Sequence, residues 1–284
     1  DVFLDAKERG EFIETAEFAG NMYGTSRGAI NRVQMAGLIC VLDIEMHGVH
    51  QIKKTPGVEP HYVFIKPPSI EELEVRLRAR KTETEDIVSL IKKLAPVSVA
   101  GIPLVRFGSA YDGGYLIPDD LDDIKACFSP GVGALIDFEN DCLSKGMKVF
   151  LADNTIDANT LPLGKFNYTN KNIGSYSTET LITIDEWVKS SDVKSSSDLL
   201  LQMDIEGHEY AAISNLSKDT QNRFRIIAVE FHGLNNLWSK DFFITASEVF
   251  NKLLETHMCV HIHPNNWDPF VYSFPFIYQW KFAF

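Results

Sequence analysis

The sequence predicts an α/β protein with a mostly parallel sheet and helices on both of its faces. From residue 104 onward, apolar runs of strand length alternate with segments of helical pattern, which is the order of a parallel sheet. Several of these apolar runs also end in acidic residues, as expected where the carboxyl ends of strands border a ligand site. The 284 residues, 45% of them hydrophobic and 23% charged, suffice for one large or two ordinary globular domains.

The first part of the chain, residues 1–94, contains two apolar runs and one long helical segment. Residues 38–46 (LICVLDIEM) form a continuous apolar run ending in acids, which predicts a buried strand. Residues 61–68 (HYVFIKPP) predict a second strand that two prolines stop. Ser69 and Glu72 have the spacing of a capping box, so we expect a helix to begin there and continue to residue 94.

A short proline-bounded segment, residues 95–103 (APVSVAGIP), predicts a linker to a second unit, residues 104–284. In that unit strands and helices alternate again. Strands are expected within 124–133, 147–154, 197–207 and 224–233, helices within 137–146, 208–216 and 245–257, a short strand plus a helix within 180–191, and aromatic terminal strands within 270–284.

Three of these strands end in acids: Asp153, the pair Asp204 and Glu206, and Glu230. In an open parallel sheet, ligands bind outside the carboxyl ends of the strands, where the strand order reverses. The SPGVG turn (129–133) follows the first of the strands, and Asp153 ends the next one about 20 residues later, where an acid can hydrogen-bond a ribose. A simple glycine turn with a helix-capping aspartate explains the same residues.

The second unit resembles the FkbM-type methyltransferases. The resemblance rests on seven segments in order, from residue 106 to the C-terminus: DGGYLIPDDL, SPGVG, FLADNT, ITIDEW, LLLQMDIEGHEY, VEFHGLNNL and VHIHPNNW. It implies a Rossmann-like class I methyltransferase fold that uses S-adenosylmethionine, and O-methylation of a small-molecule hydroxyl, often on a sugar or polyketide. An acidic cleft would suit this cofactor, which is a sulfonium cation.

The resemblance also implies roles for single residues. Gly131 and Gly133 would hold the methionine end of the cofactor, Asp153 the ribose, and Asp112 would line the methionine or substrate side. Asp204 and Glu206 would end their strand beside the cleft, one of them near the cofactor's amino group or the reacting hydroxyl. We expect these two side chains to point to opposite faces of the strand, so we do not expect both to contact one ligand. A helix-capping role explains Glu206 as well.

His232 is the candidate catalytic base, with Asp204 as the second catalytic residue. His232 follows a predicted buried strand, and an unperturbed imidazole pKa of about 6.5 suits proton removal at neutral pH. A histidine that only caps a turn is the alternative. His261 and His263 have metal-like spacing, and with Asp204 or Glu230 would make a two-histidine, one-carboxylate set, but strand alternation explains the spacing. We therefore predict no metal.

Residues 11–85 resemble the eukaryotic guanylate kinases. The resemblance rests on three segments, GEFIETAEFAGNMYGTSRGAI, ICVLDIEMHGV and VFIKPPSIEELEVRLRARKTETED. It implies that carboxylates and hydroxyls here bind the guanine and phosphate of GMP, and that two lid arginines reach the phosphates of ATP. The residues that match the GMP site are Glu14, Tyr23, Thr25 and Glu45, with Asp43 just before the last of these; the lid residues are Arg76 and Arg80.

The phosphate-binding element of a kinase is missing from this sequence, because no G-x-x-x-x-G-K-[ST] motif occurs in it. We expect vestigial GMP binding without kinase activity, and an incomplete core in this unit. Two alternatives stay open: a guanylate kinase seen through a fragmentary chain, and a non-catalytic guanylate-kinase-like module that binds proteins. A natural fusion, a truncation and an artefactual gene model all explain the join of the two units.

The net charge and the cysteines limit which classes of partner and which compartment we expect. A formal net charge of −12 argues against a nucleic-acid surface, and no apolar run approaches the roughly 20 residues that span a bilayer. The four cysteines form no CxxC pair, which favours reduced thiols in a cytoplasmic protein. The expected partner is therefore a small-molecule methyl acceptor, without nucleic acid or membrane.

Overall fold

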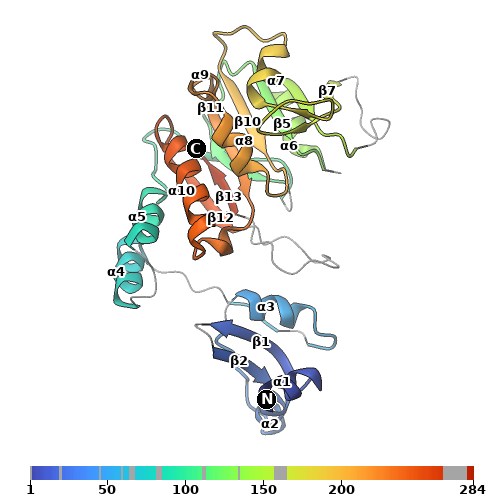
Figure 1. Cartoon of the computed structure of the whole chain (residues 1–284), viewed down its shortest axis with the longest axis vertical. Helices are drawn as coiled ribbons and strands as arrows, with labels where there is room; N and C mark the ends of the chain where they lie inside the picture. Colours follow the sequence, from blue (N-terminus) through green and yellow to red (C-terminus); the bar gives the residue numbers. More distant parts are fainter. Residues whose placement is uncertain are drawn as a thin grey trace. The chain divides into compact units, whose positions relative to one another are not determined.

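A computed structural model gives the fold as two compact units, residues 1–66 and 67–284, which are described separately (Figure 1). The second unit begins before the predicted linker, so it includes two helices that the sequence placed in the first part. The structure describes residues 2–18, 21–44, 46–58, 60–63, 68–80, 85–110, 113–133, 135–156, 165–264 and 280–284.

The first unit is built on an antiparallel hairpin. It comprises α1 (Val2–Glu8), β1 (Phe12–Phe18), β2 (Asn21–Ser26), α2 (Arg27–Met35) and α3 (Met46–Lys53). Helix α3 is fixed to the hairpin by the amide of Gln51, whose Oε1 accepts from the backbone N–H of Thr15 at 2.8 Å and whose Nε2 donates to the carbonyl of Thr15 at 2.6 Å. The Gln51 side chain of α3 thus satisfies both the N–H and the carbonyl of Thr15 in β1.

The strand predicted at residues 38–46 is wrong over the part that the structure describes. Residues 38–44 have no regular secondary structure, and Ile39 and Val41 are 90% and 85% exposed. A strand needs a neighbour to hydrogen-bond, and among the described residues of this unit β1 and β2 pair only with each other. The expected incomplete core therefore shows as exposed apolar side chains. Of the predicted strand 61–68, residues 61–63 are irregular and 64–67 lie outside the described residues.

The helix predicted from Ser69 to residue 94 is two helices, α4 (Ile70–Arg80) and α5 (Glu85–Lys93), with residues 81–84 outside the described part. The predicted cap is confirmed, since Ser69 Oγ accepts from the N–H of Glu72 at 3.2 Å. Helix α5 buries Ile87, Val88 and Leu90, and Leu90 joins the core of the second unit. It is there because its apolar face needs the sheet of that unit to cover it.

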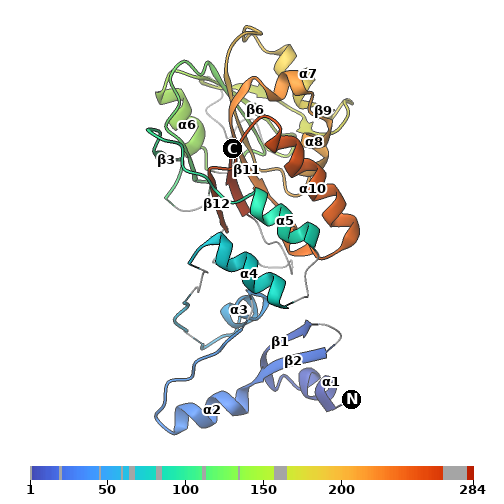
Figure 2. The same cartoon turned by 90° about the vertical axis from the view of Figure 1, so that its left-hand side faces the viewer.

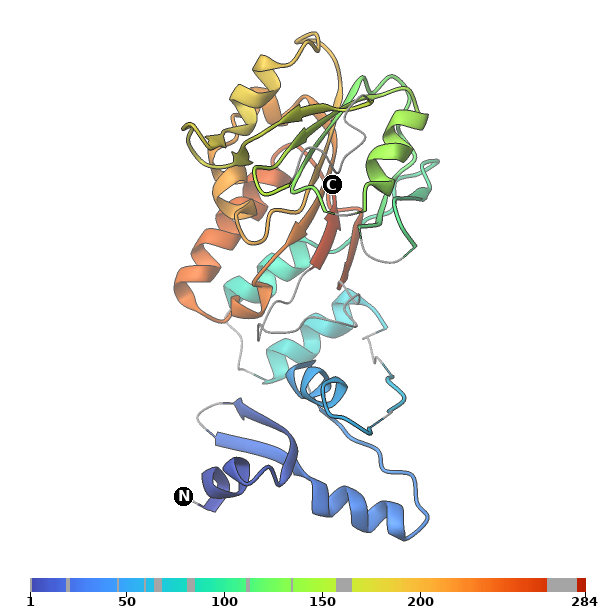
Figure 3. The same cartoon turned by 90° about the vertical axis from the view of Figure 1, so that its right-hand side faces the viewer.

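The second unit contains a seven-stranded sheet in which β13 alone is antiparallel to its neighbours (Figure 3). The predicted α/β fold with a mostly parallel sheet is thereby confirmed. From one edge to the other the strands are β12 (His261–Pro264), β13 (Trp280–Ala283), β11 (Phe224–Phe231), β10 (Leu199–Met203), β5 (Ala126–Pro130), β6 (Lys148–Ala152) and β7 (Asn167–Thr169). Two small sheets pair β3 (Leu104–Phe107) with β4 (Tyr115–Pro118), and β8 (Asn172–Ile173) with β9 (Leu181–Ile182).

Both faces of this sheet are covered (Figure 2). Strand alternation sends Leu199, Leu201 and Met203 to one face and Leu200 to the other, and all are buried. The first face carries α5, α7 (Ile184–Ser190), α8 (Glu209–Asn215) and α10 (Lys240–Leu254), and the second carries α6 (Asp137–Ser144) with the β3–β4 hairpin; α9 (Lys218–Gln221) and the short 3-10 helix Leu234–Asn236 complete the unit. No helix in the described ranges is long and apolar enough to cross a membrane.

The chain reverses direction across the sheet between β5 and β10. It first moves outward from β5 through β6 to β7, then returns to place β10 on the other side of β5 and continues to β11. A crevice outside the carboxyl ends of the strands forms at such a point in α/β proteins. The ends of β5 and β10 are therefore where a ligand site is expected.

Candidate functional site

Gly131 and Asp204 bring the ends of β5 and β10 into contact. Gly131 has a left-handed backbone, with φ of 80°, and a Cβ placed on it would lie 1.5 Å from the carbonyl oxygen of Asp204. Its N–H donates to the carbonyl of Ala152, the last residue of β6, at 3.2 Å. Only glycine satisfies both the backbone angle and this spacing. Three adjacent strand ends thus meet at Gly131.

Asp153 links the end of β6 to the glycine turn. Its side chain is buried, and Oδ2 accepts from the N–H of Val132 at 3.2 Å, while Oδ1 accepts from the N–H and hydroxyl of Thr155 at 2.7 and 2.6 Å. The predicted residues Gly131, Asp153 and Asp204 therefore share one edge of the sheet. Gly133 follows in the same turn and is exposed, and a Cβ there would meet only the backbone N of Leu135 at 3.9 Å. Asp112 lies outside the described residues.

His232, just beyond the end of β11, sits among carboxylates. Its Nδ1 lies 3.0 Å from Glu209 Oε1, and its Nε2 lies 3.3 Å from Glu206 Oε2 and 3.7 Å from Asp204 Oδ1. The hydroxyl of Tyr210 donates to the backbone carbonyl of His232 at 2.9 Å and fixes its position. His232 is 5% exposed and Glu209 is fully buried, so the imidazole is enclosed.

The predicted charge state of His232 is wrong. Burial lowers the pKa of this imidazole, but the hydrogen bonds with Glu206 and Glu209 and the charges of Glu209 and Asp204 outweigh burial and raise the pKa to about 10. At neutral pH the ring is then an imidazolium with no lone pair to accept a proton. The role of neutral base assumed an unperturbed pKa for His232, whereas the surrounding carboxylates raise that pKa.

Asp204 and Glu206 reach the same imidazole, so the expectation that they point apart is wrong. Residues two apart on a strand share a face, so strand alternation itself does not direct these side chains apart. Beyond the end of β10 at Met203, Glu206 has a left-handed backbone, with φ of 55°. Burial, and then the charge of Glu230, raise the pKa of Asp204 well above its usual range. The hydrogen bond with His232 lowers the pKa of the more exposed Glu206.

Glu209 is the site residue that sequence reasoning missed. Its Oε1 accepts from the N–H groups of Ile205 and Gly207, both at 3.1 Å, in addition to contacting His232. Glu209, in the first turn of α8, thus fixes the loop between β10 and that helix. The only signal was its place next to His208 after an acidic strand end, which does not distinguish it from a helix-surface glutamate.

Three potential metal ligands also meet here, and they differ from the set considered on the sequence. The ligand atoms of Asp204, Glu230 and His232 all lie within 4.8 Å of one another, the one such group of this kind found in the part of the chain that the structure describes. His261 and His263 instead contact each other, with Nε2 and Nδ1 2.8 Å apart. The prediction of no metal considered these two histidines, and the cluster at the ends of β10 and β11 does not include them.

In the first unit, three of the residues that match the GMP site, Glu14, Tyr23 and Thr25, share one face of the hairpin. Glu14 pairs with Thr25 across the strands, and Tyr23 lies two residues before Thr25 on the same face. The hydroxyl of Thr25 donates to Glu14 Oε1 at 2.5 Å, and Glu14 is 6% exposed. Asp43 is exposed in the irregular segment.

Three further kinase-like residues are Glu45, Arg76 and Arg80. Glu45 is outside the described residues. Arg76 Nε donates to Glu72 Oε1 at 2.7 Å within α4, and both side chains are exposed. Arg80 ends α4, and its side chain lies outside the described part. The predicted lid role of the two arginines stays a prediction.

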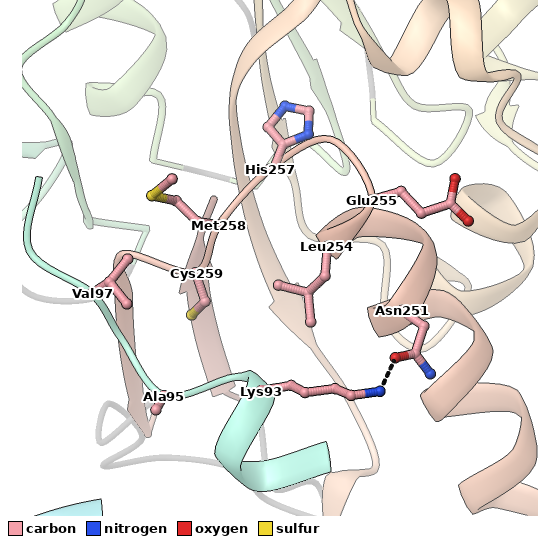
Figure 4. A pocket seen from close by; sticks show the side chains of 9 residues that line it. All are labelled: Lys93, Ala95, Val97, Asn251, Leu254, Glu255, His257, Met258 and Cys259. Atoms are coloured by element: carbon pink, nitrogen blue, oxygen red, sulfur yellow. Dashed lines mark hydrogen bonds between the residues drawn. The ribbon is translucent and has the colours of Figure 1, made fainter. Parts of the chain in front are cut away.

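A surface hollow lies beside the amino end of β11 (Figure 4). His257 lines it and bonds through Nε2 to the carbonyl of Phe224, the first residue of β11, at 2.6 Å. Its other lining residues come from the end of α5, the segment after it, α10 and the segment that follows α10: Lys93, Ala95, Val97, Asn251, Leu254, Glu255, Met258 and Cys259. Because it faces the amino ends of the parallel strands, this hollow is separate from the Gly131–Asp204 edge.

Comparisons with known proteins match two parts of the chain to two families. Residues 131–277 match the family described as methyltransferase FkbM domain, and residues 1–96 match the guanylate kinase family. The chain is 56% identical over 86 residues to the guanylate kinase of Sus scrofa and 54% identical over 86 residues to that of Homo sapiens, covering 30% of this chain and 42% of each relative. The guanylate kinase of Schizosaccharomyces pombe is 50% identical over 85 residues, 30% of this chain and 41% of the relative. The chain thus spans less than half the length of these curated relatives.

Proposed function

Because the chain belongs to the methyltransferase FkbM domain family, we propose that its second unit transfers a methyl group from S-adenosylmethionine to a hydroxyl of a small molecule such as a sugar. The observation that supports this most is the contact of Gly131 with the carbonyl of Asp204 between β5 and β10. It places a glycine turn and two acidic strand ends at the point where α/β folds bind ligands. Gly131, Asp153 and Asp204 then lie along one edge of the sheet.

The residues at this edge fit a cationic cofactor. Gly133 is exposed and lies beside open space, and Asp153 fixes the turn that precedes it. We propose that the backbone from Gly131 to Gly133 holds the methionine end and Asp153 the ribose. The cofactor supplies an electrophilic methyl group, and the carboxylates nearby complement its positive sulfur.

The acceptor hydroxyl is proposed to bind beside Asp204. Methyl transfer needs an oxygen held in line with the methyl group and a group that takes its proton. Asp204 is about a third exposed although its Oδ1 has no accessible surface, so the exposure falls on its other atoms. We propose that Oδ2 of Asp204 takes the proton, while His232, through Asp204 Oδ1 and Glu206, holds the two carboxylates in place.

Calorimetric titration of the purified chain with S-adenosylmethionine, GMP and ATP tests this proposal. We expect S-adenosylmethionine to bind with a dissociation constant on the order of micromolar and ATP not to bind. Binding of GMP and ATP without S-adenosylmethionine would overturn the methyltransferase proposal and favour a nucleotide kinase.

For the first unit we propose GMP binding without phosphoryl transfer. Buried Glu14, held by Thr25, is placed to accept from the N–H groups of a guanine, and Tyr23 is exposed on the same face. The sequence given has no phosphate-binding loop for ATP. Calorimetry with GMP on the wild type and on Glu14→Ala tests this. Equal GMP binding by both removes Glu14 from the site, and no binding by either favours the protein-interaction alternative.

We propose a cytoplasmic location and small molecules as partners, rather than nucleic acid or membranes. The four cysteines are free thiols and three of them are buried, which suits a reducing compartment. The acidic charge of −12 opposes binding to polyanions. Fractionation of cells that express the whole protein tests the location, and recovery in a membrane or nuclear fraction would contradict it.

A further inference from the structure

We propose that Asp204, Glu230 and His232 bind a divalent cation, and that Mn²⁺ is the ion that suits them best. The three side chains come from the ends of β10 and β11, and their ligand atoms lie within 4.8 Å of one another. That spacing allows one ion to contact all three after small side-chain rotations, since metal–ligand bonds of about 2 Å separate ligands by roughly 3 to 4 Å. The site adjoins the proposed cofactor edge, but ion binding does not depend on methyl transfer.

The imidazole of His232 is oriented as a metal ligand usually is. Glu209 Oε1 lies 3.0 Å from Nδ1, and the same oxygen is fixed by the N–H groups of Ile205 and Gly207. A buried carboxylate on one ring nitrogen sets the tautomer and directs the other nitrogen to an ion. Here the other nitrogen, Nε2, faces Asp204 and Glu206. Glu209 is thus a positioning residue for the site.

An unsatisfied oxygen of Asp204 provides the second observation. Asp204 Oδ1 has no accessible surface and no hydrogen-bond partner, yet it lies 3.7 Å from His232 Nε2. A buried carboxylate oxygen that accepts no hydrogen bond costs free energy that a bound ion would recover. Glu230 is 1% exposed and reaches the same place from the adjacent strand.

The ligand set selects the kind of ion. Carboxylate oxygens suit Mg²⁺, Ca²⁺ and Mn²⁺, whereas imidazole nitrogen suits transition metals such as Zn²⁺, Fe²⁺ and Cu²⁺. Two carboxylates with one imidazole form a mixed set, and we take Mn²⁺ as the occupant because it accepts both donor types and its binding can be followed directly by electron paramagnetic resonance. Three protein ligands leave positions open on an octahedral ion, and Asp204 Oδ2 stays available on the exposed part of its side chain. A hydroxyl bound to such an ion would lose its proton more readily.

The competing occupant is a proton on His232. Three carboxylates lie within ion-pairing distance of this ring and would be partly neutralised by a protonated imidazole in the ion-free chain. An ion must displace that proton, so binding would release it. Titration of the chain with Mn²⁺ decides whether the ion or the proton on His232 occupies the cluster.

Electron paramagnetic resonance of Mn²⁺ tests the proposal on the whole chain after removal of metals with a chelator. The signal of free Mn²⁺ should fall until one ion per chain is bound. Asp204→Asn and Glu230→Gln should each raise the dissociation constant at least about tenfold, as loss of a ligand does. Glu248→Gln, an exposed carboxylate of α10, is the matched control and should leave binding unchanged. Mn²⁺ should also raise the unfolding temperature of the wild type.

Two results would overturn the site. The first is a folded wild type that binds no Mn²⁺, whether or not it binds Zn²⁺ or Mg²⁺. The second is Mn²⁺ binding whose dissociation constant Asp204→Asn and Glu230→Gln leave unchanged. Should one of these variants not fold, the stoichiometry and the thermal shift of the wild type decide alone. Calorimetry with S-adenosylmethionine on the same sample separates the two proposals. A chain that binds the cofactor but no Mn²⁺ overturns only the ion site, and the reverse result overturns only the methyltransferase.

Discussion

The backbone of Gly131 lies against the carbonyl of Asp204 so closely that a single added carbon would come within 1.5 Å of that oxygen. The two residues are 73 positions apart in sequence, from Gly131 to Asp204, and end adjacent parallel strands. This contact sets the spacing of the proposed cofactor edge. It also joins the glycine turn to the acidic cluster around His232.

Gly131→Ala should therefore damage both stability and cofactor binding. Alanine would be strained at the left-handed φ and would push β5 and β10 apart, at a cost of at least about 2 kcal/mol in the free energy of unfolding. Urea unfolding measures this. Gly133→Ala is the control, because its Cβ would meet only the backbone N of Leu135 at an ordinary 3.9 Å, and its change should stay within about 0.5 kcal/mol. Equal effects of the two substitutions would show that the close contact is not a constraint.

Glu139→Gln should remove a pH-dependent weakness of the fold. Burial raises the pKa of Glu139 despite its hydrogen bond with Ser129. The Ser129 hydroxyl has one proton yet lies 2.5 Å from both Glu139 Oε1 and Gln202 Oε1, so a neutral Glu139 that donates to Ser129 satisfies all three groups.

The sign follows from the raised pKa. The unfolded chain loses this proton near the ordinary value of 4.5, and the folded chain loses it only at higher pH, so the wild type loses stability as pH rises from 4.5 through the folded pKa. Glutamine keeps a donor for Ser129 and does not titrate. Urea unfolding from pH 4.5 to 8 should show the variant gaining relative to the wild type as pH rises. A variant that instead loses stability toward pH 8 would contradict this.

Asp185→Asn should show the opposite pH dependence. Asp185 in α7 accepts from the N–H of Ser217 at 2.9 Å and from the hydroxyls of Ser217 and Thr220, which fixes the start of α9. Burial opposes the charged form, but these hydrogen bonds outweigh it and lower the pKa. Its contribution is therefore present above the unfolded pKa and is lost as pH falls through the folded pKa.

At pH 7 we expect Asp185→Asn to cost about 1 kcal/mol, a modest value because the side chain is partly exposed. The difference from the wild type in urea unfolding should shrink below about pH 4. Glu186→Gln, the exposed neighbour, is the control and should change little. A cost for Asp185→Asn that does not vary with pH would mean that the charge is irrelevant to this cap.

The sheet could be predicted from the sequence because its strands carry their own signal. Residues 199–203 are apolar or amide and are all buried in β10, and the acid that follows marks the strand end. The segment 38–44 has an equally apolar pattern but is not a strand, since pairing depends on a neighbour that its own residues do not encode. An apolar run predicts that a segment would be stabilised by burial, but it does not show that the rest of the chain supplies the strand or surface that buries it.

The site could be predicted only in part for a related reason. Gly131, Asp153 and Asp204 could be placed together because the carboxyl ends of parallel strands share one edge. The charge of His232 could not, because the loop after β10 supplies Glu206 and Glu209 through turns that strand alternation does not describe. The residues that set the pKa were thus visible in the sequence, but their distances were not.

The most direct test of the account is calorimetry of S-adenosylmethionine binding to the wild type, Asp153→Ala and Thr155→Val. We predict that Asp153→Ala loses at least about tenfold in affinity, as removal of a ribose-binding carboxylate should. Thr155→Val removes one donor to Asp153 but keeps the carboxylate, and should bind as the wild type does. Unchanged affinity in a folded Asp153→Ala, or no binding by the wild type, would contradict a cofactor site at the Gly131–Asp204 edge.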